Sequence, residues 1–134
     1  MGYRLTVRDW NNGDSKEIAL LHEQMGMGYQ FPDTNGPLFC LKKAIIDEGG
    51  RIVGAVALRL TAEAYLWLDG SRSEFQKSKA LAILNETCAK EAKILGLNDV
   101  SAWIPTKILR CFKNTLESLG WRKSPWRCFS KMLE

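Results

Sequence analysis

The sequence lacks any long hydrophobic run. No apolar stretch in the 134 residues approaches the roughly 18–20 that a membrane-spanning helix needs. The first residues also lack the basic start, apolar centre and small-residue cleavage site of an export signal. We therefore expect a soluble, cytoplasmic protein with no membrane partner.

Histidine is nearly absent, and the cysteines are scattered. His22 is the one histidine, and the four cysteines show no short paired spacing: Cys40, Cys88, Cys111 and Cys128. We expect no metal site and no secreted disulfide framework, but reduced thiols that fill a core. A lone histidine is more often structural or exposed than catalytic, and we favour that interpretation for His22.

Low-complexity segments and internal repeats are also absent. Hydrophobic residues make up 46% of the chain and charged residues 25%, which is ordinary for a globular protein. A chain of this length suits one domain, so we expect a single domain over residues 1–134, as a monomer or homodimer.

The net charge of +4 is concentrated near the C-terminus. The segment from Lys107 to Lys131 is basic and contains Trp121 and Trp126, whose rings could stack on bases. Most such clusters are solvated faces, so a nucleic-acid partner is disfavoured and is kept as an alternative.

The first half of the chain reads as a strand, a helix and a run of strands. Residues 3–8 alternate as in a half-buried strand, and Asp14 or Ser15 could cap a helix that ends near Gly26. A loop over residues 27–37 follows. Two β-rich runs then flank the turn Asp47-Glu48-Gly49-Gly50, which predicts a hairpin over residues 38–60, with a third strand over residues 64–68.

The second half alternates helix and strand. Ser73 and Gln76 predict a capping box that starts a long helix, which Gly96 ends. A short strand over residues 100–104 precedes a helix that Thr106 could cap and Gly120 closes, and residues 121–132 supply one or two final strands. This order predicts an α/β protein: a mixed, mostly antiparallel central sheet of six or seven strands, with helices on both faces.

Three local patterns in this order resemble the GNAT superfamily of N-acyltransferases over nearly the whole chain. Arg51-Ile52-Val53-Gly54-Ala55-Val56 looks like the family's third strand, and a long helix ending in Leu95-Gly96 looks like the helix that receives the cofactor pyrophosphate. Leu116-Glu117-Ser118-Leu119-Gly120-Trp121 resembles the family's closing Tyr-Glu-Lys-Leu-Gly-Phe. The resemblance implies transfer of an acetyl group from acetyl-CoA to an amine acceptor.

The resemblance also implies the cofactor site. The family's (Gln/Arg)-x-x-Gly-x-(Gly/Ala) motif falls on Gln76, Lys77, Ser78, Lys79, Ala80 and Leu81. A splayed strand beside it, with Leu66, Trp67 and Leu68, would hold the pantetheine arm. Gln76 matches the motif, whereas Lys79 and Leu81 replace its small residues, and Leu116 replaces the tyrosine that often protonates the leaving thiolate. The chain is therefore a divergent member with a degenerate motif.

The candidate catalytic residues are Glu63 and Tyr65. Period-two alternation places Glu63, Tyr65 and Trp67 on one face of their strand, and the family's general base often arises there. We thus predict an acyl-CoA-dependent N-acetyltransferase acting on a small molecule or a protein. The alternatives are a catalytically impaired relative that binds acyl-CoA or another ligand without turnover, and the basic nucleic-acid-binding module.

Overall fold

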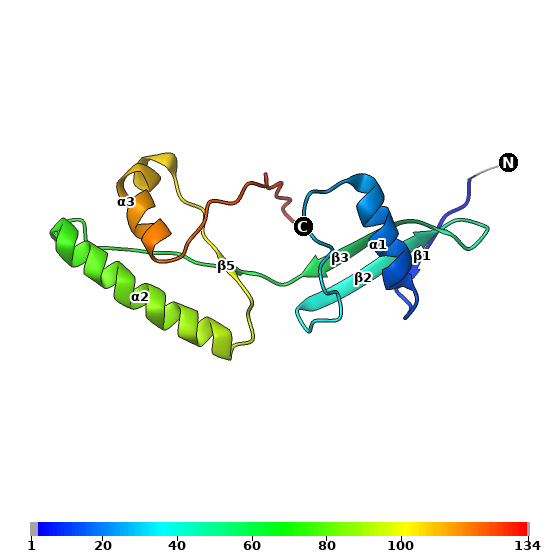
Figure 1. The fold of residues 1–134 in the computed structure, drawn as a ribbon, viewed down its shortest axis with the longest axis horizontal. Coiled ribbons are helices and arrows are strands. Elements are labelled where there is room, and N and C mark those ends of the chain that lie inside the picture. Colours follow the sequence, from blue (N-terminus) through cyan, green and yellow to red (C-terminus); the bar gives the residue numbers. More distant parts are fainter. Residues whose placement is uncertain (1–2, 134) are drawn as a thin grey trace. The chain divides into compact units, whose positions relative to one another are not determined.

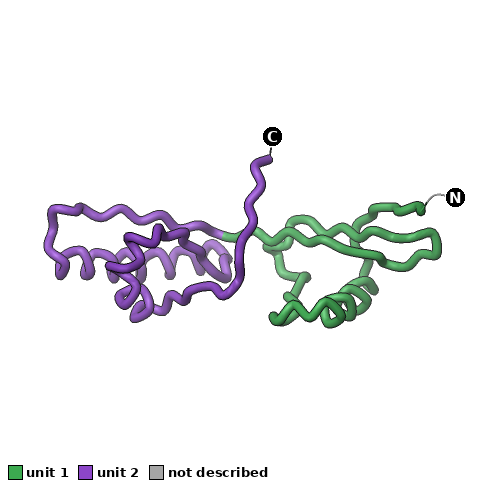
Figure 2. The backbone as a smooth tube through the Cα atoms, turned by 90° about the horizontal axis from the view of Figure 1, so that it is seen from above, with its two compact units in different colours: residues 1–61 green, residues 62–134 purple. Residues whose placement is uncertain are grey.

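The chain divides into two compact units. The computed structural model describes residues 3–133, and the division falls between Thr61 and Ala62 (Figure 2). The expectation of one domain over residues 1–134 stays a prediction. The first unit has one helix and one sheet, and the second has two helices and a sheet of its own.

The first unit is a three-stranded antiparallel sheet with one helix. Its elements are β1 (Thr6–Asp9), α1 (Asp14–Met25), β2 (Phe39–Ile46) and β3 (Ile52–Arg59), and the strand order is β1-β2-β3. The helix lies along one face of the sheet (Figure 1). The predicted hairpin is confirmed, and so is the predicted helix, which ends at Gly26 in the left-handed conformation.

The core of this unit lies between α1 and the sheet. Ile18 of α1 packs with Ala44 and Ile46 of β2 and with Ile52 of β3, and each of these four side chains is buried. Trp10, Leu21 and Phe31 pack around them.

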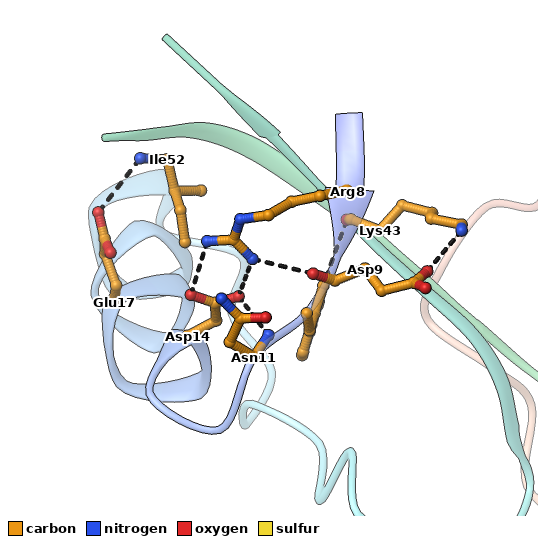
Figure 3. A network of polar contacts seen from close by, with 8 residues as sticks. Arg8, Asp9, Asn11, Asp14, Glu17, Lys43 and Ile52 are labelled. Carbon is orange, nitrogen blue, oxygen red and sulfur yellow. Dashed lines mark hydrogen bonds and ion pairs between the residues drawn. The ribbon is translucent and has the colours of Figure 1, made fainter. Parts of the chain in front are cut away.

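An ion pair joins β1 to the start of α1 (Figure 3). Arg8 donates to both carboxylate oxygens of Asp14, at 2.6 and 3.1 Å, and the backbone N–H of Asn11 donates to Asp14 Oδ2 at 2.6 Å. These bonds to the charged form lower the pKa of Asp14. The predicted cap at Asp14 or Ser15 is wrong. Gly13 is the N-cap residue of α1 and makes no side-chain bond, whereas the Asp14 carboxylate accepts hydrogen bonds from Arg8.

The second unit combines two helices with a very short parallel sheet. Its elements are β4 (Ala62–Glu63), α2 (Glu74–Ile94), β5 (Val100–Ser101) and α3 (Thr106–Ser118). Strands β4 and β5 pair with each other, and residues 64–70 run as an extended connection toward α2 (Figure 1).

The start of α2 is held by its own side chains. Ser73 Oγ accepts from the backbone N–H of Gln76, and Gln76 Oε1 accepts from the N–H of Ser73, both at 3.1 Å, so the predicted capping box is confirmed. The helix is followed by Gly96 at a φ of 85°, a conformation that glycine adopts without steric cost. The predicted Thr106 cap is wrong: Pro105 is the cap residue of α3 and makes no side-chain bond.

The predicted central sheet of six or seven strands with helices on both faces is wrong. The described chain has five strands in two separate sheets, one antiparallel with three strands and one parallel with two. Residues 64–68 alternate like a strand but are not part of one, since only Ala64 bonds to β5, and none of residues 121–133 belongs to a strand. The alternation of apolar and polar residues indicates which side chains share a face of an extended segment. Strand pairing depends in addition on a partner that is distant in the sequence.

The cysteines do not fill a core. All four are free thiols on exposed residues, so the predicted burial is wrong. Over the described part of the chain, no helix is both long and apolar enough to cross a membrane.

Candidate functional site

Strands β4 and β5 separate after only two residue pairs. Ala62 lies opposite Val100 and Glu63 opposite Ser101, and the N–H of Ala64 then donates to the carbonyl of Ser101 at 2.8 Å. Beyond that bond, residues 64–68 (the β4 segment) and 102–105 (the β5 segment) diverge without further pairing among the described residues. Both segments line a cavity of about 550 Å³, a size usual for a small-molecule site.

The cavity wall is mostly apolar. Helix α2 contributes Leu81 and Leu84, and α3 contributes Ile108, Phe112 and Leu116. Helix α3 is strongly amphipathic in sequence, and its apolar face supplies this wall. Lys77 is the one charged residue among the described residues that line the cavity.

The β4 segment offers unused backbone groups to this cavity. Tyr65, Leu66, Trp67 and Leu68 all line it, and in the described chain their N–H groups donate to no backbone carbonyl. An extended backbone with free N–H and C=O groups can bind an extended amide-bearing ligand as a neighbouring strand would.

One polar pair braces the wall. Trp121 donates its indole N–H to Asn85 Oδ1 at 2.8 Å and links the segment after α3 to α2. Both residues line the cavity. Trp121, which the sequence offered for stacking on bases, is thus engaged within the unit.

The predicted cofactor residues on α2 differ in whether they line the cavity. Lys77 and Leu81 line the cavity; the Lys77 side chain is only 16% exposed and pairs with Glu74 at 2.8 Å. Gln76 is used in the capping box. The other three, Ser78, Lys79 and Ala80, do not line the cavity. The structure thus brings Lys77 and Leu81 together with Leu66, Trp67 and Leu68.

Both predicted catalytic residues belong to one hydrogen-bonded cluster. Trp103 donates its indole N–H to Glu63 Oε1 at 2.5 Å, and Tyr65 donates its hydroxyl to Glu63 Oε2 at 3.2 Å. The bond to Glu63 raises the pKa of Tyr65, so the phenol stays protonated at neutral pH. The ring of Tyr65 stacks on that of Trp67, with centroids 6.1 Å apart. We call Glu63, Tyr65, Trp67 and Trp103 the Glu63 cluster.

His22 has a structural environment in the first unit. It lies on α1, its Nε2 donates to the carbonyl of Tyr29 at 2.6 Å, and its ring packs edge-on against Tyr29 and Phe31. A hollow of about 300 Å³ beside Trp10 is smaller than the cavity of the second unit.

Sequence reasoning missed several parts of the site. The bond from Trp103 to Glu63 joins residues 40 positions apart, and nothing in their spacing indicates it. The bond from Trp121 to Asn85 was missed for the same reason. Phe112 and Leu116 could be found, since the helical apolar stripe predicts that they face inward.

Comparison with models of known protein families and with curated proteins finds no match to this chain. Among the described residues, no group of three or more histidine, cysteine, aspartate or glutamate side chains could hold a metal ion. The chemistry of the cavity and of the Glu63 cluster therefore carries the functional assignment.

Proposed function

We propose that this protein is an acyl-CoA-dependent N-acyltransferase that transfers an acyl group, acetyl in the simplest case, to an amine. The observation that carries the proposal is the separation of β4 and β5 around an apolar cavity. A pantetheine arm is long, narrow and interrupted by two amides. The free backbone of residues 65–68 matches those amides, and the apolar wall matches the carbon chain.

Lys77 supports the placement of the diphosphate. It is the charged member of the cavity wall, and it sits in the first turn of α2, where free backbone N–H groups and the helix dipole favour negative charge. The N–H groups of Gln76 and Lys77 already bond to Ser73, so Glu74 and Phe75 hold the free amides. Glu74 is exposed and now pairs with Lys77; a diphosphate would take its place.

The Glu63 cluster supplies the chemistry. The Glu63 carboxylate accepts the proton that the attacking amine loses, the amine nitrogen bonds to the thioester carbon, and the carbon–sulfur bond breaks. The thiolate then takes a proton, for which Tyr65 is the candidate donor because Leu116 has none to give. Trp103 and Tyr65 fix the direction of the carboxylate, and such positioning contributes separately from proton transfer.

Two lysines provide a matched test of cofactor binding. Lys77→Gln should weaken acetyl-CoA binding about tenfold, because it removes the cavity's charge. Lys79→Gln removes the same charge from an exposed position outside the cavity wall and should change the affinity less than twofold. Calorimetric titration measures both. No heat with the unaltered protein at millimolar acetyl-CoA would end the proposal.

Binding without turnover is the second candidate, because Leu116 stands in the cavity wall where a proton donor would be useful. A thiol-release assay over a panel of amines separates the two. Release of free coenzyme A that depends on the amine supports the enzyme, whereas tight binding with no release under any amine supports the ligand-binding protein.

A further inference from the structure

The charge of Glu63 has no cationic partner within the described chain. Other acidic residues of the described chain form ion pairs, among them Asp9, Asp14, Glu48, Asp69, Glu74, Glu86 and Glu117. Both donors to Glu63 are neutral groups, the indole of Trp103 and the phenol of Tyr65. They orient the carboxylate and bring no opposite charge to it. Each carboxylate oxygen can accept a further hydrogen bond.

The rings around this charge are unusually exposed. Tyr65 is 69% exposed, Trp67 82% and Trp103 63%. Aromatic rings of this size normally bury most of their surface. Their faces carry negative potential that attracts cations. One unpaired carboxylate with three open rings is a site suited to an ammonium group.

We infer that the Glu63 cluster binds a cationic ammonium head group. The positive charge of the ligand lies beside the Glu63 carboxylate, and its methylene or methyl groups pack against the aromatic rings. This inference rests on the proposed function for its meaning: the acceptor binds as an ammonium ion, which excludes acidic and neutral acceptors, and it loses a proton to Glu63 before the neutral nitrogen attacks the thioester. The binding itself needs no acyl donor. Permanently methylated ammonium compounds bind the cluster although they have no N–H to acylate.

The charges of the cavity support this division. Lys77 is the charged residue of the wall and suits an anionic donor. Glu63 does not line the cavity itself, but it is hydrogen-bonded to Tyr65 and Trp103, which do, and it suits a cationic acceptor. Two ligands of opposite charge are thereby directed to different places, the anion to Lys77 in the cavity wall and the cation to Glu63 beside that wall. A cation would gain nothing at Lys77, so competition between the ligands is avoided.

Choline and its uncharged isostere 3,3-dimethyl-1-butanol form a matched pair of probes. The indole N–H of Trp103, identified by its disappearance in Trp103→Phe, reports binding by nuclear magnetic resonance. Choline should shift this resonance in a saturable way at millimolar concentration, and the alcohol should bind about tenfold more weakly because it lacks the charge. Equal affinities, or no shift with choline, would overturn the inference.

Variants locate the charge that choline recognises. Glu63→Gln should weaken choline binding about tenfold, and Glu86→Gln, which removes an exposed glutamate of α2 in the same unit, should leave it unchanged. Equal effects of the two variants would contradict the assignment. The comparison of choline with the alcohol uses the unaltered protein, so it tests the inference even if the Glu63→Gln variant does not fold.

The two proposals fail in different ways. If acetyl-CoA binds and choline binds no more tightly than the alcohol, the acyltransferase proposal is supported and the ammonium site is refuted. If choline binds through Glu63 and calorimetric titration with acetyl-CoA gives no heat, the ammonium site is supported and the acyltransferase proposal is refuted.

Discussion

The indole N–H of Trp103 meets Glu63 Oε1 at 2.5 Å, at the point where the segments after β4 and β5 part. This bond bridges the two segments across the opening of the pair. It also fixes one oxygen of the carboxylate, while Tyr65 holds the other. The residue proposed as base is therefore oriented from both strands.

Removing the base should reduce turnover more than binding. Glu63→Gln keeps the shape and loses the proton acceptor, so kcat should fall about 10²–10⁴-fold. Its effect on acetyl-CoA affinity should be less than twofold. The thiol-release assay and calorimetry measure the two quantities, with Glu86→Gln as the control of equal charge change. An unchanged kcat would remove Glu63 from the mechanism.

Trp103→Phe tests positioning without removing the ring. The indole N–H is lost and an aromatic surface remains, so the orientation of Glu63 relaxes. We expect kcat to fall about fivefold to tenfold, as for one hydrogen bond of about 1 kcal/mol, with KM for the amine changed less. A rise in KM at constant kcat would instead assign Trp103 to acceptor binding.

The Arg8–Asp14 pair predicts a pH-dependent stability of the first unit. Asp14→Asn should lower the free energy of unfolding at pH 7 by about 1.5–3 kcal/mol, the range for hydrogen bonds to charged groups. Because folding lowers the pKa of Asp14, the advantage of the native residue is complete above the unfolded pKa of about 3.9 and disappears as the pH falls through the lower folded value.

Denaturant unfolding at pH 7 and at decreasing pH checks this prediction. Asp9→Asn is the control: its pair with Lys43 is exposed, and its effect should stay within about 0.5 kcal/mol. The free energies of unfolding of Asp14→Asn and of the native chain are compared at each pH. If their difference stays constant down to pH 2, the ionised Asp14 carboxylate is not what stabilises the junction of β1 and α1.

The capping box should stabilise α2 independently of any ligand. Ser73→Ala removes the acceptor for the N–H of Gln76 and should cost about 1 kcal/mol. Ser78→Ala, inside the helix, should cost nothing, because alanine has the higher helix propensity. Circular dichroism during denaturation compares the two. Equal stabilities of the two variants would mean that the cap contributes nothing measurable.

Local signals in the sequence predicted local structure well. The glycine pair after Glu48, the capping box of Ser73 and Gln76, and the glycine at position 96 each act through neighbours within a few residues, so their outcomes can be derived from backbone preferences. The end of α1 at Gly26 and the β2–β3 hairpin follow from such signals.

Long-range pairing could not be derived in the same way. Residues 64–68 carry the alternation of a strand, yet in the described chain their backbone makes a single bond to a strand, from Ala64 to Ser101, and lines a cavity. The caps expected at Asp14 and Thr106 also failed, because Arg8 claims the Asp14 carboxylate and Pro105 occupies the position before α3. Of the site, the face shared by Glu63 and Tyr65 was predictable, whereas the bond from Trp103 was not.

The most direct measurement is a crystal structure with acetyl-CoA bound. The account predicts the pantetheine arm between residues 65–68 and 102–105, its amides bonded to the backbone of Leu66 or Leu68, and its diphosphate beside Lys77. Coenzyme bound elsewhere on the protein, or a cavity left empty at saturating acetyl-CoA, would contradict it.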